Sequence, residues 1–292
     1  MRKSINTMTT GTLSRLFSLL LLFVSAAFVS AQPAPKTAAT PVPAPAADVH
    51  ARVTETLVDS SIPNDSGVDK MLAAYSPKVR ELEVVVGKLR GELKKGGIGA
   101  GSLGNFVADG MRAQASLKLG KPIDLAVMNG GGLRRQTIGE GELRARDIFE
   151  LLPFENALVT LELTGEQVMK LLGVVVSSRE AQSGARLTYL IKADKSPELE
   201  IAKLLDQKGS EKDIDPKAMY TVVTIDYLIN VGGARYAVLR EGKNQRLLGI
   251  TLRDAMIAYV KSETAAGRDI KPNLDGRFVF DKANSVGEAP PQ

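Results

Sequence analysis

Apolar positions along the chain change between helical spacing and strand spacing. In four segments the apolar residues recur every three or four positions, which is the spacing of a helix with one buried face. One of these segments follows Thr164 and Gln167, a pair whose spacing is typical of a capping box at the start of a helix. The pattern predicts helices over Val79–Leu93, Leu103–Leu117, Val168–Val176 and Thr251–Thr264.

Shorter segments have the pattern of strands. Apolar and polar residues alternate through Ala157–Leu163, which is the period of a strand with one buried face. Because helices and strands are interspersed, we expect one α+β (mixed α/β) domain in which helices cover a mixed sheet. The other predicted strands are Ile123–Met128, Arg186–Ile191, Met219–Ile225 and Gly276–Phe280.

Residues 1–31 have the composition of a secretory signal peptide. Three basic residues and no acidic one accompany an apolar run, Leu16–Val29, which ends in the small-x-small pattern Val29-Ser30-Ala31. The run is shorter than the roughly 20 residues that a membrane-spanning helix needs. We therefore expect cleavage after Ala31, export to the periplasm or the extracellular space, and no stable membrane anchor. Retention as an uncleaved anchor is the alternative.

The rest of the chain divides into three parts. Residues 32–47 consist almost wholly of Ala, Pro and Thr, which predicts a disordered, extended tether. Residues 48–282 carry the apolar patterns and are expected to fold as one domain, followed by a disordered tail over residues 283–292. Removing the three positive charges of the signal peptide lowers the net charge from +5 to +2. The basic composition therefore gives no reason to expect a nucleic-acid partner.

The residue counts exclude several kinds of chemistry. The 292 residues include no Cys and one His. Disulfides, thiol nucleophiles, lipid-modified Cys and sites with several His ligands are therefore excluded. The single His, in Asp48-Val49-His50, could begin a metal-binding motif, but no other His exists to complete one. We interpret His50 as an exposed residue at the end of the tether.

A glycine-rich segment after a predicted strand is the strongest candidate for ligand binding. The apolar run ending at Met128 is followed by Asn129, three glycines and then Arg134. Glycines allow backbone N–H groups to approach a ligand closely, and an Arg side chain can bind phosphate or carboxylate oxygens in a bidentate manner. The candidate contacts are Asn129, Gly131, Gly132 and Arg134; the alternative is a flexible turn with a solvated Arg.

Two aromatic residues near predicted strand ends are further candidates. Phe154 lies in a turn before a predicted strand, where it could fill the core or stack on a planar ring at the rim of a pocket. Tyr227 follows a predicted strand and precedes a glycine pair, so a ring and a closely approaching backbone could line a site there. Three arginines could add positive charge, although a surface position is the simpler interpretation: Arg179, Arg186 and Arg235.

Several of these segments together resemble one known family. The order and spacing of five motifs are similar to those of the C-terminal domain of the 5′-nucleotidase/UDP-sugar hydrolase/2′,3′-cyclic phosphodiesterase family. The resemblance covers roughly Val68–Leu239 and implies a domain that recognises the substrate, while a separate N-terminal calcineurin-like domain holds two metal ions and hydrolyses it. The motifs are NFVADGMR (Asn105–Arg112), MNGGGLR (Met128–Arg134), GELRARDIFELLPFENALVTLELTG (Gly141–Gly165), QSGAR (Gln182–Arg186) and DYLINVGGARY (Asp226–Tyr236).

The resemblance also implies roles for individual residues. Asn129 and Arg134 would hold the base and the phosphate of a nucleotide. Phe154 and Tyr227 would match the two aromatic residues that clamp the base. Stacking of this kind tolerates different bases, because every base has an aromatic face.

Two polar anchors of the family are missing from this sequence. The family usually carries an Arg and a Glu just upstream of its LGN segment, and here Gly96–Ser102 contains neither. Family members also tend to carry Asp after the second glycine pair, where this chain has Ala234, with Val231 inserted before the pair. Nucleotide affinity could therefore be weak, altered in specificity or lost.

The chain also lacks the metal-binding motifs of the family's hydrolytic domain. We therefore expect no catalytic residue, no metal ligand and no cofactor in this chain, and no activity by the chain alone. The leading hypothesis is an exported nucleotide- or nucleoside-recognition domain of a split 5′-nucleotidase, whose separate calcineurin-like metallophosphatase chain holds the divalent metal pair. The alternatives are a non-catalytic extracytoplasmic nucleoside- or nucleotide-binding protein and a degenerate domain kept for structure or interaction.

Overall fold

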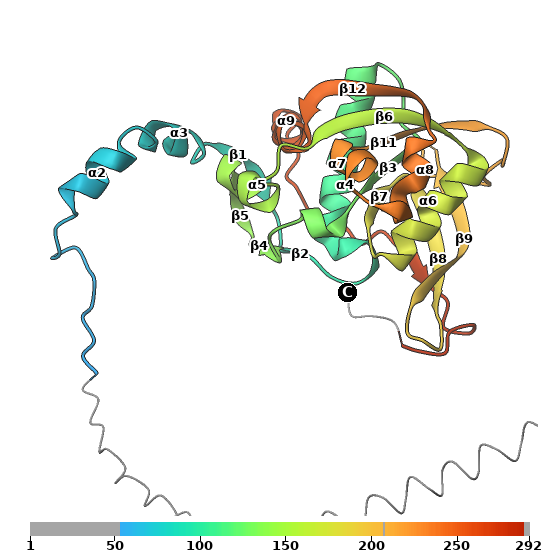
Figure 1. The fold of residues 1–292 in the computed structure, drawn as a ribbon, viewed down its shortest axis with the longest axis horizontal. Helices are drawn as coiled ribbons and strands as arrows, with labels where there is room; N and C mark the ends of the chain where they lie inside the picture. The colour runs from blue at the N-terminus through green and yellow to red at the C-terminus, as the bar shows by residue number, and fades with distance from the viewer. Residues whose placement is uncertain (1–52, 207, 289–292) are drawn as a thin grey trace, which may run out of the picture. The chain divides into compact units, whose positions relative to one another are not determined.

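The computed structural model describes residues 53–206 and 208–288. The predicted signal peptide, the predicted tether and His50 lie outside the described residues. The chain separates into two units, residues 1–63 and 64–292. In the described part of the first unit, the N–H of Ile62 donates to the carbonyl of Asp59 at 3.1 Å and closes a turn. The helices and strands below belong to the second unit (Figure 1).

A five-stranded mixed sheet forms the centre of the second unit (Figure 1). β3 and β11 run parallel, and the other neighbouring strands are antiparallel. All four residues of β3 are buried, as its uninterrupted apolar run predicts. The α+β fold with a mixed sheet is therefore confirmed. In spatial order the strands are β12 (Lys243–Thr251), β6 (Ala157–Thr164), β11 (Met219–Ile225), β3 (Leu125–Met128) and β7 (Ala181–Ser183).

Three helices pack around this sheet, and two of them start at the predicted caps. At the start of α6, the Thr164 hydroxyl accepts the N–H of Gln167 at 3.3 Å, and the Gln167 side chain accepts the N–H of Thr164 at 2.9 Å. Thr251 caps α9 by accepting the N–H of Asp254 at 3.1 Å. α4 contacts β3 and β7 and packs on α9, whereas α6 contacts β6. The helices are α4 (Gly101–Leu119), α6 (Gly165–Ser177) and α9 (Leu252–Ala265).

A second sheet of four strands packs beside α6. β8 alternates between buried and half-buried residues along its length, and β13 pairs with it in parallel. The order is β10 (Glu211–Lys212), β9 (Pro197–Leu205), β8 (Ala185–Ile191) and β13 (Phe278–Phe280).

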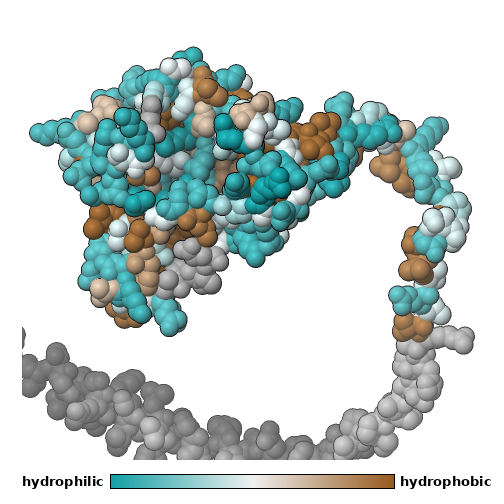
Figure 2. Space-filling view, turned by 180° about the vertical axis from the view of Figure 1, so that it is seen from behind, coloured by the Kyte–Doolittle hydropathy of each residue, from teal (hydrophilic) through white to brown (hydrophobic). Residues whose placement is uncertain are grey.

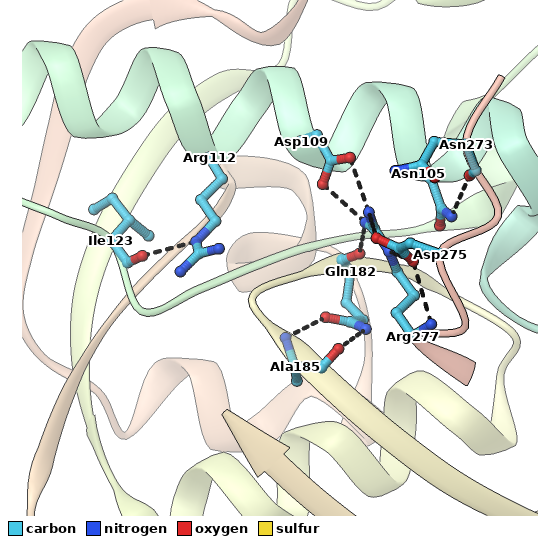
Figure 3. A network of polar contacts seen from close by, with 9 residues as sticks. All are labelled: Asn105, Asp109, Arg112, Ile123, Gln182, Ala185, Asn273, Asp275 and Arg277. Carbon is cyan, nitrogen blue, oxygen red and sulfur yellow. Dashed lines mark hydrogen bonds and ion pairs between the residues drawn. The ribbon is translucent and has the colours of Figure 1, made fainter. Parts of the chain in front are cut away.

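The buried guanidinium of Arg277 connects the segment before β13 to α4 (Figure 3). It donates to both carboxylate oxygens of Asp109 on α4, at 2.8 and 2.9 Å. It also donates to the carboxylate of Asp275, at 2.9 and 2.7 Å, and to the carbonyl of Gln182 at 2.9 Å. This network stabilises the packing of the C-terminal strand against the helix beside the central sheet.

The predicted helix over Val79–Leu93 is wrong. A short helix, α3 (Ser76–Glu81), is followed instead by β1 (Val85–Leu89) and β2 (Leu93–Lys94). Three consecutive valines precede Gly87, and β-branched side chains favour strands. A Cβ at Gly87 would collide with side chains of α9, so the glycine allows β1 to approach that helix. β1 and β2 pair with β5 (Gly141–Arg144) and β4 (Thr137–Ile138), respectively.

Two short helices before β1 have no buried residue. α2 (Ser66–Leu72) begins at Asp65, whose carboxylate accepts the N–H groups of Gly67 and Val68 at 2.8 and 3.0 Å. Figure 2 shows apolar surface along this part of the chain. The exposed apolar residues of α2, α3 and the turn between them are Val68, Met71, Leu72, Tyr75 and Val79.

Part of the segment predicted as a tail contacts the second sheet. The hydroxyl of Ser285 accepts the N–H of Ile191 at 3.0 Å, and the N–H of Val286 donates to the carbonyl of Ile191 at 2.9 Å. The chain therefore stays in contact with the C-terminal end of β8 at least as far as Val286. In the described ranges, no helix has the length and apolar character required to cross a membrane.

Candidate functional site

The predicted site segments meet at one edge of the five-stranded sheet. β3 and β11 are parallel, so the segments beginning at Asn129 and Asp226 leave the sheet at the same edge. β6 is antiparallel to β11, and Leu158 near its start pairs with Ile225 at the end of β11. The loop before β6 therefore reaches the same edge. Ligands often bind in the crevice outside the carboxyl ends of parallel strands.

The glycine segment forms a tight turn directly after β3. The N–H of Gly132 donates to the carbonyl of Asn129 at 3.0 Å, and the N–H of Leu133 donates to the carbonyl of Gly130 at 3.2 Å. A Cβ at Gly132 would lie 3.2 Å from Oδ1 of Asn129, so the glycine leaves room for this amide. Oδ1 of Asn129 is buried and accepts no hydrogen bond from the described residues. It is therefore a candidate acceptor for an N–H or O–H group of a ligand.

A buried carboxylate connects this turn to a second segment of the site. Glu180, directly before β7, is 6% exposed. Its Oε2 accepts the N–H of Gly130 at 2.6 Å, and its Oε1 accepts the hydroxyl of Tyr236. Burial raises the pKa of Glu180, although these two hydrogen bonds and the charges of Arg235 and Lys95 act in the opposite direction. Burial and the Glu180 contact also raise the pKa of Tyr236, which keeps its hydroxyl protonated.

Tyr227 lies at the start of a helix that follows β11 directly. It is the second residue of α7 (Asp226–Asn230) and is 43% exposed. One carboxylate oxygen of Asp226 accepts the N–H of Tyr227 at 2.8 Å and the N–H of Ala157 at 3.1 Å. This carboxylate therefore joins the start of α7 to the start of β6, and it orients the backbone that carries Tyr227.

Phe154 is a surface residue in the loop before β6. Its ring is 48% exposed, which excludes the core position that composition alone left open. The Arg134 guanidinium carbon lies 5.8 Å from the centre of the ring, within the range of a cation–π contact. Buried Arg253 donates to the carbonyl of Pro153 at 3.4 Å and to the carboxylate of Glu155 at 3.1 Å. Arg253 therefore holds the loop on both sides of Phe154.

A cavity of about 630 Å³ opens beside the glycine turn. This volume is within the usual range for small-molecule sites. Of the predicted site residues, Asn129, Gly131 and Tyr227 line the cavity. The other three are outside its lining: Gly132, Arg134 and Phe154. The polar and charged side chains that complete the lining are Lys95, Gln136, Ser178, Arg179, Glu180, Arg235 and Tyr236.

The sequence left open whether three arginines lie at the site or elsewhere on the surface, and the structure separates them into two groups. Arg179 and Arg235 line the cavity, so they add positive charge to the site. Arg235 also donates to the Ser178 hydroxyl at 3.3 Å. Arg186 instead forms an ion pair with Glu211 at 2.8 Å, on the second sheet.

Lys95 and Glu180 are cavity residues that sequence reasoning missed. Lys95 follows β2 and reaches the glycine segment because β2 pairs with β4, which follows that segment. A basic residue directly before Gly96-Gly97 was a signal that could have identified Lys95. Glu180 lies in a short connection between α6 and β7, where no local pattern distinguishes it from a solvated acid.

Comparison with known proteins identifies the family. The family described as "5′-nucleotidase, C-terminal domain" matches residues 82–241, which is more than half of the chain. The chain belongs to this family. The glycine turn, Phe154, Glu180 and Tyr227 all lie inside the matched residues, so the candidate site is part of the family domain.

Curated relatives match this 5′-nucleotidase C-terminal domain at moderate identity. The trifunctional nucleotide phosphoesterase protein YfkN of Bacillus subtilis is 29% identical over 184 residues, covering 61% of this chain and 12% of that protein. The 5′-nucleotidase of Vibrio vulnificus is 30% identical over 143 residues, covering 47% of this chain and 24% of that protein. The chain therefore spans a quarter or less of the length of these relatives.

Solved structures support the same fold. The 5′-nucleotidase precursor from Thermus thermophilus superimposes with a TM-score of 0.62 and 25% identity, covering 75% of this chain and 44% of that chain. The NAD nucleotidase of Haemophilus influenzae superimposes with a TM-score of 0.57 at 20% identity, covering 76% of this chain and 42% of that chain. In both cases the matched region is less than half of the larger protein.

Proposed function

We propose that this chain is an exported nucleotide- or nucleoside-recognition domain of a split 5′-nucleotidase. In this proposal it supplies substrate binding, and a separate metallophosphatase chain carries out the hydrolysis. The observation that carries the proposal is the convergence of the Asn129 glycine turn, Phe154 and Tyr227 at one sheet edge. Membership of the 5′-nucleotidase C-terminal domain family supports it.

The chemistry of the site fits the parts of a nucleotide. Oδ1 of Asn129 receives no hydrogen bond from the described residues. It could therefore accept a hydrogen bond from a base or a sugar. Half-exposed Phe154 and Tyr227 offer faces on which a base could stack. Arg134 is placed beside Phe154, so that a phosphate and a base bound there would be neighbours.

The proposal assigns hydrolysis to another chain. A metal pair in that chain would activate the attacking water, while the residues described here would hold and orient the substrate. Within residues 53–206 and 208–288, no group of three or more His, Cys, Asp or Glu side chains is arranged to hold a metal ion. Domains of this family are usually joined to a metallophosphatase domain, so a separate partner chain belongs to the proposal.

Export also belongs to the proposal. It rests on the signal pattern of residues 1–31 and the Pro/Ala-rich tether of residues 32–47. N-terminal sequencing of the protein recovered from the periplasm or the medium tests this part. A mature chain beginning at Gln32 would support cleavage after Ala31. A chain recovered from the membrane with its N-terminus at Met1 or Arg2 would contradict it.

Calorimetry with the purified chain tests ligand binding. AMP, adenosine and UDP-glucose are titrated separately. Each contains a base joined to ribose, while the base differs between the adenine compounds and UDP-glucose and the charge differs between AMP and adenosine. Binding of any of the three supports a recognition domain. No heat from any of them, confirmed by a thermal-shift measurement without stabilisation, would refute the function and favour a domain kept for structure or interaction.

A hydrolysis assay tests the division of labour. The chain alone, with Mg²⁺, Mn²⁺ or Zn²⁺ added, is expected to release no phosphate from AMP. Addition of a calcineurin-like metallophosphatase that lacks its own C-terminal domain should restore hydrolysis. Release of phosphate by this chain alone would contradict the proposal, and ligand binding without any stimulation of such an enzyme would favour a non-catalytic binding protein.

A further inference from the structure

α2 and α3 carry one row of exposed apolar side chains, which we call the apolar row. Both helices belong to the second unit, and neither contains a buried residue. The apolar residues recur every three or four positions, which is the spacing of one helical face. Exposed apolar surface that gathers on one face marks an interaction site. The apolar row consists of Val68, Met71, Leu72, Tyr75 and Val79, which are between 47 and 64% exposed.

The turn between the two helices keeps a helical backbone. The N–H of Ala73 donates to the carbonyl of Asp69 at 2.9 Å, and the N–H of Tyr75 donates to the carbonyl of Leu72 at 2.9 Å. The N–H of Val79 donates to the carbonyl of Tyr75 at 3.1 Å. Ala73 and Tyr75 both have right-handed helical dihedral angles. Residues eleven positions apart, about three helical turns, therefore lie on the same side of this segment.

Opposite charges lie beside the two ends of the apolar row. Asp69 lies beside its start and Arg80 beside its end, eleven positions apart and therefore on the same flank. Neither forms an ion pair with another described residue. Lys70 and Glu81 are each two positions from a member of the row, so they lie on the opposite face, and Lys78 lies on the other flank. One flank is therefore acidic at the start of the row and basic at its end.

We propose that the apolar row binds the same row of a second copy of this chain, with the two segments antiparallel. A two-fold axis between Ala74 and Tyr75 brings equal flanks together, so that Asp69 of each copy faces Arg80 of the other. Symmetry forms this ion pair twice, and the apolar side chains of each copy cover those of the other. A parallel pair would instead bring acid near acid and base near base, which is unfavourable.

Sedimentation of the purified chain at a series of concentrations tests the pairing. We expect the wild type to form a dimer. Leu72→Gln places a polar group in the middle of the apolar row of both copies and should weaken the dimer by about 10-fold or more. Leu117→Gln makes the same change at an exposed position of α4 and should leave the dimer unchanged. Because α2 and α3 bury no residue, both variants should keep the wild-type urea midpoint.

Charge reversal tests the contact between Asp69 and Arg80. Asp69→Arg and Arg80→Asp should each weaken the dimer by about 3- to 10-fold at low salt, because each places like charges together at two symmetric positions. The two changes combined reverse the pair and should restore most of the affinity. A combined variant that dimerises no better than either single variant would refute the contact.

Cross-linking tests the antiparallel orientation. The chain has no Cys, so one introduced Cys can form a disulfide only with its counterpart in the second copy. Tyr75→Cys lies beside the two-fold axis and should cross-link on oxidation. Val68→Cys lies about 20 Å from its counterpart and should not. Equal cross-linking of the two variants would refute the antiparallel pair.

The remaining outcomes overturn the proposal without touching the proposed function. A wild type that is monomeric at all concentrations has no second copy on the apolar row. A dimer unaffected by Leu72→Gln has its interface elsewhere. A monomer that forms a one-to-one complex with a calcineurin-like metallophosphatase, and loses it in Leu72→Gln, uses the apolar row for that partner instead. None of these measurements depends on nucleotide binding.

Discussion

Tyr236 donates a hydrogen bond from its hydroxyl to the buried carboxylate of Glu180. The same carboxylate accepts the N–H of Gly130 in the glycine turn. These two donors come from segments about 100 residues apart in the chain that follow different strands of the sheet. One side chain therefore holds two walls of the cavity in a fixed relation, and a change at Glu180 should affect both walls together.

The raised pKa of Glu180 predicts how its replacement changes stability with pH. The folded-state pKa lies above the ordinary value of 4.5, so the stability that Glu180 contributes is fully present below that value. It is lost as the pH rises through the folded-state pKa, because the buried carboxyl must then ionise. Relative to Glu180→Gln, the wild type should therefore lose unfolding free energy as the pH increases from acid to neutral. Urea unfolding at a series of pH values measures this difference.

Exposed Glu140 provides the control for this series. Glu140→Gln changes the same functional group on the exposed surface outside the cavity, and its unfolding is measured over the same pH range. A Glu180→Gln profile parallel to that of the Glu140→Gln variant would contradict the assigned effect of burial.

Removal of either aromatic face should weaken nucleotide binding. Phe154→Leu and Tyr227→Leu each remove a stacking surface while keeping an apolar side chain. We expect each to reduce AMP affinity by about 1–3 kcal/mol, the usual contribution of one base–aromatic contact. Leu247→Ala is the control: it removes an exposed apolar side chain on β12, outside the cavity lining, and should have no effect on affinity. If both aromatic variants bind AMP as tightly as the wild type, the aromatic clamp is wrong.

Asn129→Ala should separate binding from stability. Oδ1 of Asn129 makes no hydrogen bond to the described residues, so its removal should change the free energy of unfolding by less than about 0.5 kcal/mol. Loss of a ligand hydrogen bond should weaken nucleotide affinity by about 0.5–1.5 kcal/mol. Asn105→Ala should behave in the opposite way, because Asn105 is buried and donates to the carbonyl of Asn273 at 2.8 Å. Destabilisation by Asn129→Ala, with unchanged affinity, would exclude it as a ligand contact.

The Arg277 network predicts a stability difference between two arginines. Arg277→Met leaves Asp109 and Asp275 without their shared partner and should cost about 3 kcal/mol of unfolding free energy. Arg268→Met removes an exposed ion pair with Glu263 and should change the unfolding midpoint only slightly. Denaturant titration of both variants makes the comparison, and equal midpoints would show that the network of Figure 3 adds no more than a surface pair.

Acid should reduce the effect of Arg277→Met. Burial acts to raise the pKa of Asp275, but the hydrogen bond and charge of Arg277 outweigh it, so the pKa lies below its ordinary value of 3.8. A lowered folded-state pKa contributes stability above that ordinary value and loses it as the pH falls. The unfolding free energies of the wild type and Arg277→Met should therefore converge below about pH 4.

Local patterns in the sequence predicted the parts of the fold that local physics determines. Thr164 and Gln167 form the predicted capping box, and the apolar run before Asn129 is the buried strand β3. The prediction of a helix over Val79–Leu93 was wrong because it used only the spacing of apolar residues. It did not take into account the strand preference of the β-branched valines or the contact of Gly87 with α9. That contact depends on a helix about 170 residues further along the chain.

The candidate site was predictable only where one segment carried the whole signal. Asn129 and Gly131 were proposed from the glycine turn and Tyr227 from its place after a strand, and these three residues line the cavity. Lys95 and Glu180 were missed because their contacts with Leu133 and Gly130 depend on strand pairing across the sheet. No short-range pattern contains the pairing that places Glu180, whereas the position of Lys95 directly before Gly96-Gly97 was a local signal that was not used.

The parallel pair of β3 and β11 has a consequence for redesign of the domain. The turn after Asn129, the loop around Phe154 and the segment from Asp226 are separate connections that begin or end on strands whose register is set by buried residues. Glu180 hydrogen-bonds the first of these connections at Gly130 and the segment beyond the third at Tyr236, and Asp226 joins the third connection to the start of β6. A loop exchange that keeps these contacts would change the side chains presented at the strand ends and leave the strands in place.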